Sequence, residues 1–107
     1  MPPRPDGRDR QGHESDQEAD LQRFDAELRQ LELEYTMFFA GQRLRPPLAS
    51  QAALDARIRR WDRVPMQGSA ERFRFNTIQT RFRTFANLWD RGLRAREEGR
   101  PGPFSRP

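Results

Sequence analysis

The sequence contains no cysteine and no lysine, and it has one histidine among its 107 residues. Without cysteine the chain forms no disulfide, no thiolate metal site and no cysteine nucleophile. The histidine, His13, lies in a polar stretch where we expect neither a metal site nor a proton shuttle. No apolar run approaches the roughly 20 residues that span a bilayer, and no apolar block follows the N-terminal arginines as in a secretory signal. We therefore expect a cytoplasmic protein with no membrane contact.

Hydrophobic residues are scarce: they make up 34% of the chain, the same share as charged residues. A chain of this length and composition forms one small domain with a thin core. Residues 1–15 are almost devoid of apolar side chains, so we expect a disordered N-terminal tail. Residues 99–107 form a tail rich in proline and glycine, in which Phe104 is the one residue able to dock on a core. The remainder, 16–98, is the expected folded domain.

A first long helix is predicted at about 16–41. Ser15 and Glu18 fit the capping box that starts a helix, and Gly41 fits a C-terminal cap. Apolar residues recur between them at alternating intervals of three and four, which is heptad spacing. This stripe consists of Leu21, Phe24, Leu28, Leu31, Tyr35 and Phe38. A second, shorter stripe, which predicts contact with two neighbours, consists of Leu33, Met37 and Ala40.

Two further helices follow the Pro46-Pro47 linker. Ser50 fits the cap of a short helix at about 51–63, and a second long helix is predicted at about 69–98. The apolar stripe of this long helix consists of Phe75, Ile78, Phe82, Phe85, Trp89 and Leu93. Gly92 weakens the helix by about 1 kcal/mol relative to alanine, unless another helix approaches closely there.

These elements predict an all-α fold, in which the two long helices form an antiparallel hairpin and the short helix packs on it. Residues 1–42 carry a net charge of −5, whereas 43–63 and 64–107 carry +4 and +5. The predicted hairpin places the acidic residues 16–20 beside the arginines at 91–96. Charge thus favours the pairing of the two helices, while burial of the aromatic stripes supplies most of the stability.

All 20 basic residues are arginine, and two interpretations of this excess stay open. One is a polyanionic partner, either nucleic acid or an acidic protein surface. The other is a GC-rich genome, in which arginine codons replace lysine codons throughout. Six arginines within 43–63 form the most basic stretch, and Trp61 inside it has the spacing of a core residue rather than of a base-stacking platform.

A second set of arginines follows one face of the helix at 69–98, opposite its apolar stripe, because eleven residues make almost three whole turns. Together the two sets give the predicted partner-binding residues, which are Arg57, Arg59, Arg60, Arg63, Arg72, Arg83, Arg91 and Arg94. Phe73 points away from the stripe. We expect the turn at 65–68 to cover it, and the alternative is that Phe73 is an exposed contact for a partner.

No pattern in the sequence indicates catalysis. The glycine-rich phosphate loops of nucleotide-binding proteins are absent, and no acidic residue is paired with a base or nucleophile. We therefore expect no enzyme activity, no catalytic residues, no cofactor and no metal site.

Several strings resemble a small helical domain found in C-terminal regions of larger proteins from myxobacteria and related bacteria. They are the string 34–41, the Pro46-Pro47 turn, the string 72–77, Leu88-Trp89 and the string 93–99. The resemblance covers about 25–103 and implies a bacterial, cytosolic, helical accessory domain, with no established activity or binding residues to transfer. This chain departs from the pattern because it lacks a large N-terminal partner domain, so we expect it to act in trans.

The expected function is a non-catalytic interaction module that binds a protein partner through its arginine-rich outer faces. One alternative is a nucleic-acid-binding or ribosome-associated protein that uses the same arginines. Another is a homodimeric coiled coil formed by the first helix. In a parallel dimer Glu27, Glu32 and Glu34 would repel their own copies, which favours the intramolecular arrangement.

Overall fold

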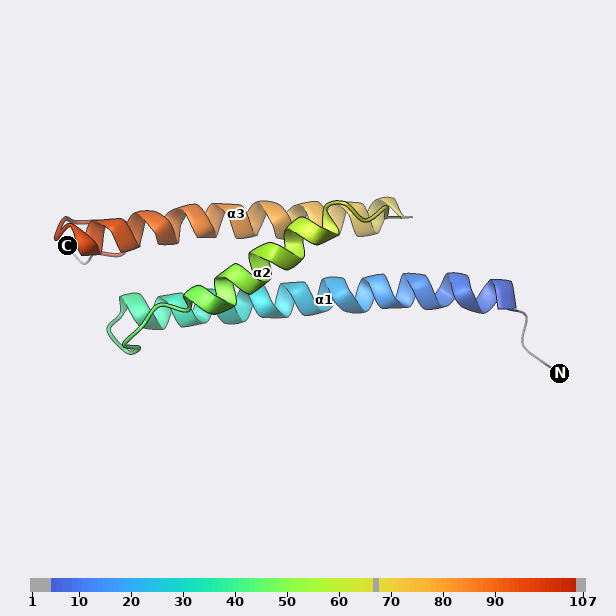
Figure 1. Cartoon of the computed structure of the whole chain (residues 1–107), viewed down its shortest axis with the longest axis horizontal. Helices are drawn as coiled ribbons and strands as arrows, with labels where there is room; N and C mark the ends of the chain where they lie inside the picture. The colour runs from blue at the N-terminus through green and yellow to red at the C-terminus, as the bar shows by residue number, and fades with distance from the viewer. Residues whose placement is uncertain (1–4, 67, 106–107) are drawn as a thin grey trace.

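The computed structural model describes the backbone of residues 5–66 and 68–105, and the side chains from residue 17 onward within these ranges. It contains three α-helices, α1 (Pro5–Phe39), α2 (Leu48–Trp61) and α3 (Ser69–Glu97), and no strand in the part of the chain that it describes. The predicted all-α class, with two long helices and one short helix, is confirmed (Figure 1).

The two long helices lie side by side and run in the same direction, while α2 runs back diagonally across the pair (Figure 1). Contacts between α1 and α3 occur in the same order along both helices, from N-terminus to C-terminus. In order, they are Glu18–Arg74 (3.5 Å), Glu32–Arg81 (2.8 Å) and the Phe38 carbonyl with Arg96 (3.4 Å). The antiparallel direction predicted for the long helices is therefore wrong. Helix α2 runs antiparallel to α1 and brings the chain back to the N-terminal end of the bundle, so α3 starts there and runs parallel to α1. Residues 16–20 accordingly do not lie beside 91–96.

The core is formed by the two predicted stripes together with one face of α2. All six stripe residues of α1 are at most 7% exposed. Their buried partners are Leu54 and Ile58 of α2 and Phe75, Ile78, Phe82 and Trp89 of α3. The second stripe of α1 is not a buried stripe, since Leu33 is 52% exposed and Ala40 is exposed too. Phe39 takes its place and packs against the core from the last turn of α1. The contact with two neighbours that the stripe predicted is present, because Tyr35 in this half of α1 contacts both α2 and α3.

Tyr35 links all three helices at the centre of this core. Its ring stacks on Trp89 of α3 with the ring centroids 4.3 Å apart, and on Phe39 at 5.9 Å. Its hydroxyl donates a hydrogen bond to Oε1 of Gln51 on α2. Burial raises the pKa of the Tyr35 hydroxyl above its ordinary value, and the negative charge of Asp90 raises it further.

The starts of α1 and α2 differ from the predicted ones, whereas α3 starts at Ser69 as predicted. The backbone of α1 is helical from Pro5, so the helix passes through Ser15 instead of starting at a capping box there. Extending an existing helix costs much less than nucleating one, so propagation beyond the packed region is physically reasonable. The first four residues of the predicted tail lie outside the described residues. Helix α2 starts at Leu48, with Pro47 as its N-cap and no side-chain cap.

The C-terminal ends of α1 and α3 are closed by glycine in the left-handed conformation, as predicted for Gly41. Gly41 has φ +80°, and the next N–H, that of Gln42, donates to the Met37 carbonyl at 2.8 Å. Gly99 has φ +67°, and an equivalent 2.8 Å bond follows it from Arg100 to Ala95. Both helices thus end in the same hydrogen-bonded motif.

The segment after α3 docks on the bundle through Phe104, a question that the sequence left open. Its ring stacks on Phe39 with centroids 3.9 Å apart and planes 3° apart. Gly92 makes this possible, because a Cβ there would lie 2.7 Å from Phe104 and 2.8 Å from Phe39. The close approach that would justify a glycine inside this helix is therefore present.

We predict that Gly92→Ala destabilises the protein, although helix propensity alone favours alanine by about 1 kcal/mol. The added methyl overpacks the two rings and costs about 1–3 kcal/mol. Urea unfolding followed by circular dichroism measures the change. In a Phe104→Ala background the penalty becomes smaller, since one of the two rings is gone. Strictly additive effects of the two substitutions would contradict this packing.

We also predict that stability falls with rising pH from about 10 upward. In this range the unfolded chain loses the Tyr35 proton while the folded chain, with its raised pKa, retains it. The unfolded state therefore binds fewer protons, and rising pH favours it. No other side chain titrates near pH 10, because the chain has a single tyrosine, Tyr35, and contains neither lysine nor cysteine.

Tyrosinate absorbance of the folded protein should rise only above the ordinary pKa of tyrosine, and Tyr35→Phe should remove the alkaline loss of stability. An ordinary titration in the folded chain would refute the assignment.

Candidate functional site

The acidic residues of α1 from Glu18 onward are neutralised by ion pairs within the molecule. Four of its glutamates form ion pairs with arginines from other parts of the chain. These pairs are Glu18–Arg74, Glu27–Arg57, Glu32–Arg81 and Glu34–Arg43. The negatively charged part of α1 that the structure describes therefore lies against the positive later parts of the chain, and it presents little net charge to a partner along this seam.

Arg57, one of the predicted partner-binding residues, serves the fold. Its guanidinium pairs with Glu27 of α1 and lies 4.9 Å from the centre of the Phe24 ring. The side chain thus covers the edge of the core between α1 and α2. Arg59 and Arg94 have only local pairs one turn away, with Asp55 at 3.3 Å and Asp90 at 3.2 Å, and both side chains are largely exposed.

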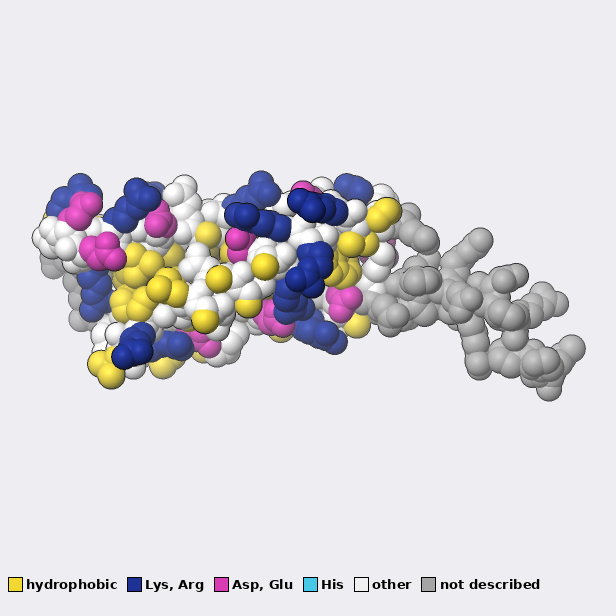
Figure 2. All heavy atoms as spheres, in the orientation of Figure 1, with side chains coloured by type: hydrophobic (Ala, Val, Ile, Leu, Met, Phe, Trp, Pro, Cys, Tyr) yellow, Lys and Arg dark blue, Asp and Glu magenta, His cyan; other side chains and the backbone are white. Residues whose placement is uncertain are grey.

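The other five predicted arginines are exposed, and among the described residues none has a carboxylate within ion-pair distance. They are Arg60, Arg63, Arg72, Arg83 and Arg91. Figure 2 shows basic side chains gathered over the C-terminal half of α2 and the neighbouring part of α3. Arg60, Arg63 and Arg72 flank the α2–α3 turn, whereas Arg91 lies towards the other end of α3.

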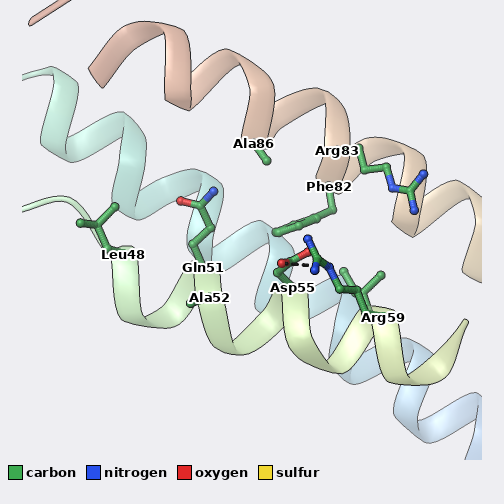
Figure 3. A pocket seen from close by; sticks show the side chains of 9 residues that line it. Leu48, Gln51, Ala52, Asp55, Arg59, Phe82, Arg83 and Ala86 are labelled. Carbon is green, nitrogen blue, oxygen red and sulfur yellow. Dashed lines mark ion pairs between the residues drawn. The ribbon is translucent and has the colours of Figure 1, made fainter. Parts of the chain in front are cut away.

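A groove of about 680 Å³ lies between α2 and α3. It exists because α1 packs against both helices, whereas α2 and α3 contact each other far less. Its α2 side consists of Leu48, Gln51, Ala52, Asp55, Ile58 and Arg59, and its α3 side of Phe82, Arg83 and Ala86. In Figure 3 the Phe82 ring and the Ala86 methyl point from α3 towards α2. The groove therefore has an apolar floor with one arginine on each side.

Sequence reasoning did not find this groove, although it named both of its arginines. The one sequence feature that hints at the groove is the small side chain at Ala52 and Ala86. Larger apolar residues at these two positions would fill the gap between α2 and α3. The prediction for Trp61 fits the structure, since its ring packs edge-on against Phe24 at 5.3 Å. The prediction for Phe73 is wrong: the side chain is 73% exposed and is not covered by the preceding turn.

The described residues contain no cluster of three or more metal-ligating side chains. Tyr35, the described group with a displaced pKa, uses its hydroxyl inside the core. None of the described helices is both long and apolar enough to cross a membrane. What the surface does present is guanidinium groups, an apolar groove and the exposed Phe73.

Arg57 and Arg60 should respond differently to substitution, although they lie one turn apart on α2. We predict that Arg57→Gln lowers the free energy of unfolding by about 1 kcal/mol, because the ion pair and the ring contact are both lost. Arg60→Gln should change it by less than about 0.5 kcal/mol, as expected for an unpaired surface residue. Urea midpoints of the two variants provide the comparison, and equal midpoints would remove the structural role of Arg57.

Comparison with known proteins gives no relative: no family model matches the chain, and neither does any curated protein or solved structure. The resemblance to a C-terminal domain of myxobacterial proteins therefore stays a prediction.

Proposed function

We propose that this protein is a non-catalytic interaction module that binds an acidic protein surface through the arginines of α2 and α3. One observation carries the proposal. The acids of α1 from Glu18 onward are engaged in ion pairs within the chain, whereas Arg60, Arg63, Arg72, Arg83 and Arg91 face solvent without a carboxylate partner among the described residues. The resemblance stated above adds a cytoplasmic bacterial setting to this proposal.

The groove favours a protein partner over nucleic acid. Protein interfaces combine an apolar centre with a polar rim, and arginine is enriched in them. The groove has this composition, with Ile58 and Phe82 in its floor and Arg59 and Arg83 beside them. A phosphate backbone makes no use of an apolar floor. Trp61, the aromatic residue inside the basic stretch, packs against Phe24 instead of offering its face to a base.

The homodimeric coiled coil is the less favoured alternative. Its contact surface would be the stripe of α1, and every member of that stripe is already buried against α2 and α3. Dimerisation through the stripe would require the bundle to open.

We predict that the full chain binds fluorescent poly-L-glutamate at low salt. The triple variant Arg60→Gln, Arg63→Gln and Arg72→Gln should weaken this binding by about tenfold or more, because these arginines have no ion-pair partner among the described residues and face solvent. Fluorescence anisotropy measures the binding. A matched control, Arg23→Gln, Arg29→Gln and Arg100→Gln, removes the same charge from exposed sites with local ion pairs and should have much less effect.

The same assay with duplex DNA and single-stranded RNA separates the two partner classes. Tighter binding of either nucleic acid, with a steep fall in affinity as salt rises, would replace the protein partner by a polynucleotide. Failure to bind any of the three polyanions at low salt would overturn the proposed function.

A further inference from the structure

We infer that the groove between α2 and α3 receives an amphipathic α-helix of the partner, with apolar residues on one face and acidic residues on both flanks of that face. The bound helix would complete a four-helix bundle. This inference rests on the proposed function and specifies which kind of acidic protein segment the module recognises and where.

The shape of the groove fits a helix. Its α2 side extends from Leu48 to Arg59, which is about 16 Å or three helical turns. The side chains at 52 and 86 are single methyl groups, so a helix backbone can approach both walls closely. Of the three seams in a three-helix bundle, α1 closes the two that it shares with α2 and α3, while the α2–α3 seam stays open. A fourth helix would fill that seam.

The floor of the groove calls for apolar side chains on the bound helix. Ile58 and Phe82 are nearly completely buried below it, so the apolar surface still open to a ligand is that of Leu48, which is 55% exposed, of Ala52, which is exposed, and of the half-buried Ala86. A ridge of apolar residues at helical spacing would cover Leu48 and replace solvent above the floor. This is the helix-in-groove mode of recognition, in which anchors at every third or fourth residue enter one continuous groove.

The charges beside the floor favour acidic flanks. Arg83 on α3 has no carboxylate within ion-pair distance among the described residues, and Arg59 on α2 has only its local pair with Asp55 (Figure 3). Acidic residues on the two edges of a bound helix would meet one guanidinium on each side. A second copy of this chain fits less well, because face-to-face grooves would bring together twice as many guanidinium groups as carboxylates.

The test uses the full chain and two synthetic peptides of identical composition. One arranges leucine and alanine at helical spacing with glutamate on both flanks, and the other scrambles the order. We expect the amphipathic peptide to bind about tenfold more tightly and to become helical on binding. Fluorescence anisotropy gives the affinities, and circular dichroism reports the helicity.

Two pairs of variants locate the binding. Ala52→Tyr fills the groove and should weaken the amphipathic peptide by about tenfold. Ala56→Tyr, at an exposed position of α2 outside the groove, should not. Similarly, Arg83→Gln should weaken binding more than Arg91→Gln, which removes the same charge outside the groove. Circular dichroism confirms that each variant is folded.

The outcomes separate the two proposals. Equal binding of both peptides, still sensitive to the triple arginine variant, would overturn the helix-in-groove inference and leave the proposed function standing. Selective binding that is indifferent to Ala52→Tyr would place the helix elsewhere and also overturn the inference. Sedimentation showing a dimer that dissociates with Ala52→Tyr would assign the groove to a second copy instead. If neither peptide binds although poly-L-glutamate does, the helix-in-groove inference is overturned and the proposed function stands.

Discussion

The apolar stripe of α1 is shared by two other helices, and this sharing determines the rest of the structure. One ridge of six residues, from Leu21 to Phe38, is covered by α2 and α3 at the same time. A chain with 34% hydrophobic residues has enough apolar side chains to close the two seams along α1, but the third seam, between α2 and α3, is left with alanines. The groove is thus a consequence of a thin core and of which helix stands at its centre.

The helices were predictable from the sequence, but the direction of the long pair was not. The alternating three- and four-residue spacing of a heptad stripe is the same in both chain directions. It therefore predicts that two helices pack together, but not whether they run parallel or antiparallel. Glu32 and Arg81 lie near the middle of the packed regions and meet in either arrangement, whereas Glu18 and Arg74 meet only when the helices are parallel. The informative feature was the connection between the long helices. Because this connection is itself a helix that runs back along α1, the chain turns once before it and once after it, and the two long helices end up parallel.

The candidate site was predictable as a set of exposed arginines, but their division into two groups required the fold. Arg57 follows the buried Leu54 by three residues and precedes Trp61 by four, which places it at the border of the inward face. That border position was a sequence signal for a structural role. The partner on the other side, Glu27, is 30 residues away, and no local pattern links the two. The groove escaped prediction for the same reason, since its walls come from helices whose spacing is set by α1.

The exclusive use of arginine as the basic residue has a structural consequence of its own. Near the edges of the core, three guanidinium groups each combine a polar contact with the face of an aromatic ring. Arg57, Arg81 and Arg96 lie 4.9, 5.8 and 4.7 Å from the centres of the rings of Phe24, Phe85 and Phe38. A planar guanidinium stacks on a ring while donating hydrogen bonds in its plane, which an ammonium group does less well. Arginine therefore extends a core that is short of hydrophobic residues, and the arginine excess divides into side chains that seal the bundle and side chains that face solvent. Only the second group carries the proposal of a partner, because its members lose nothing internal when they bind.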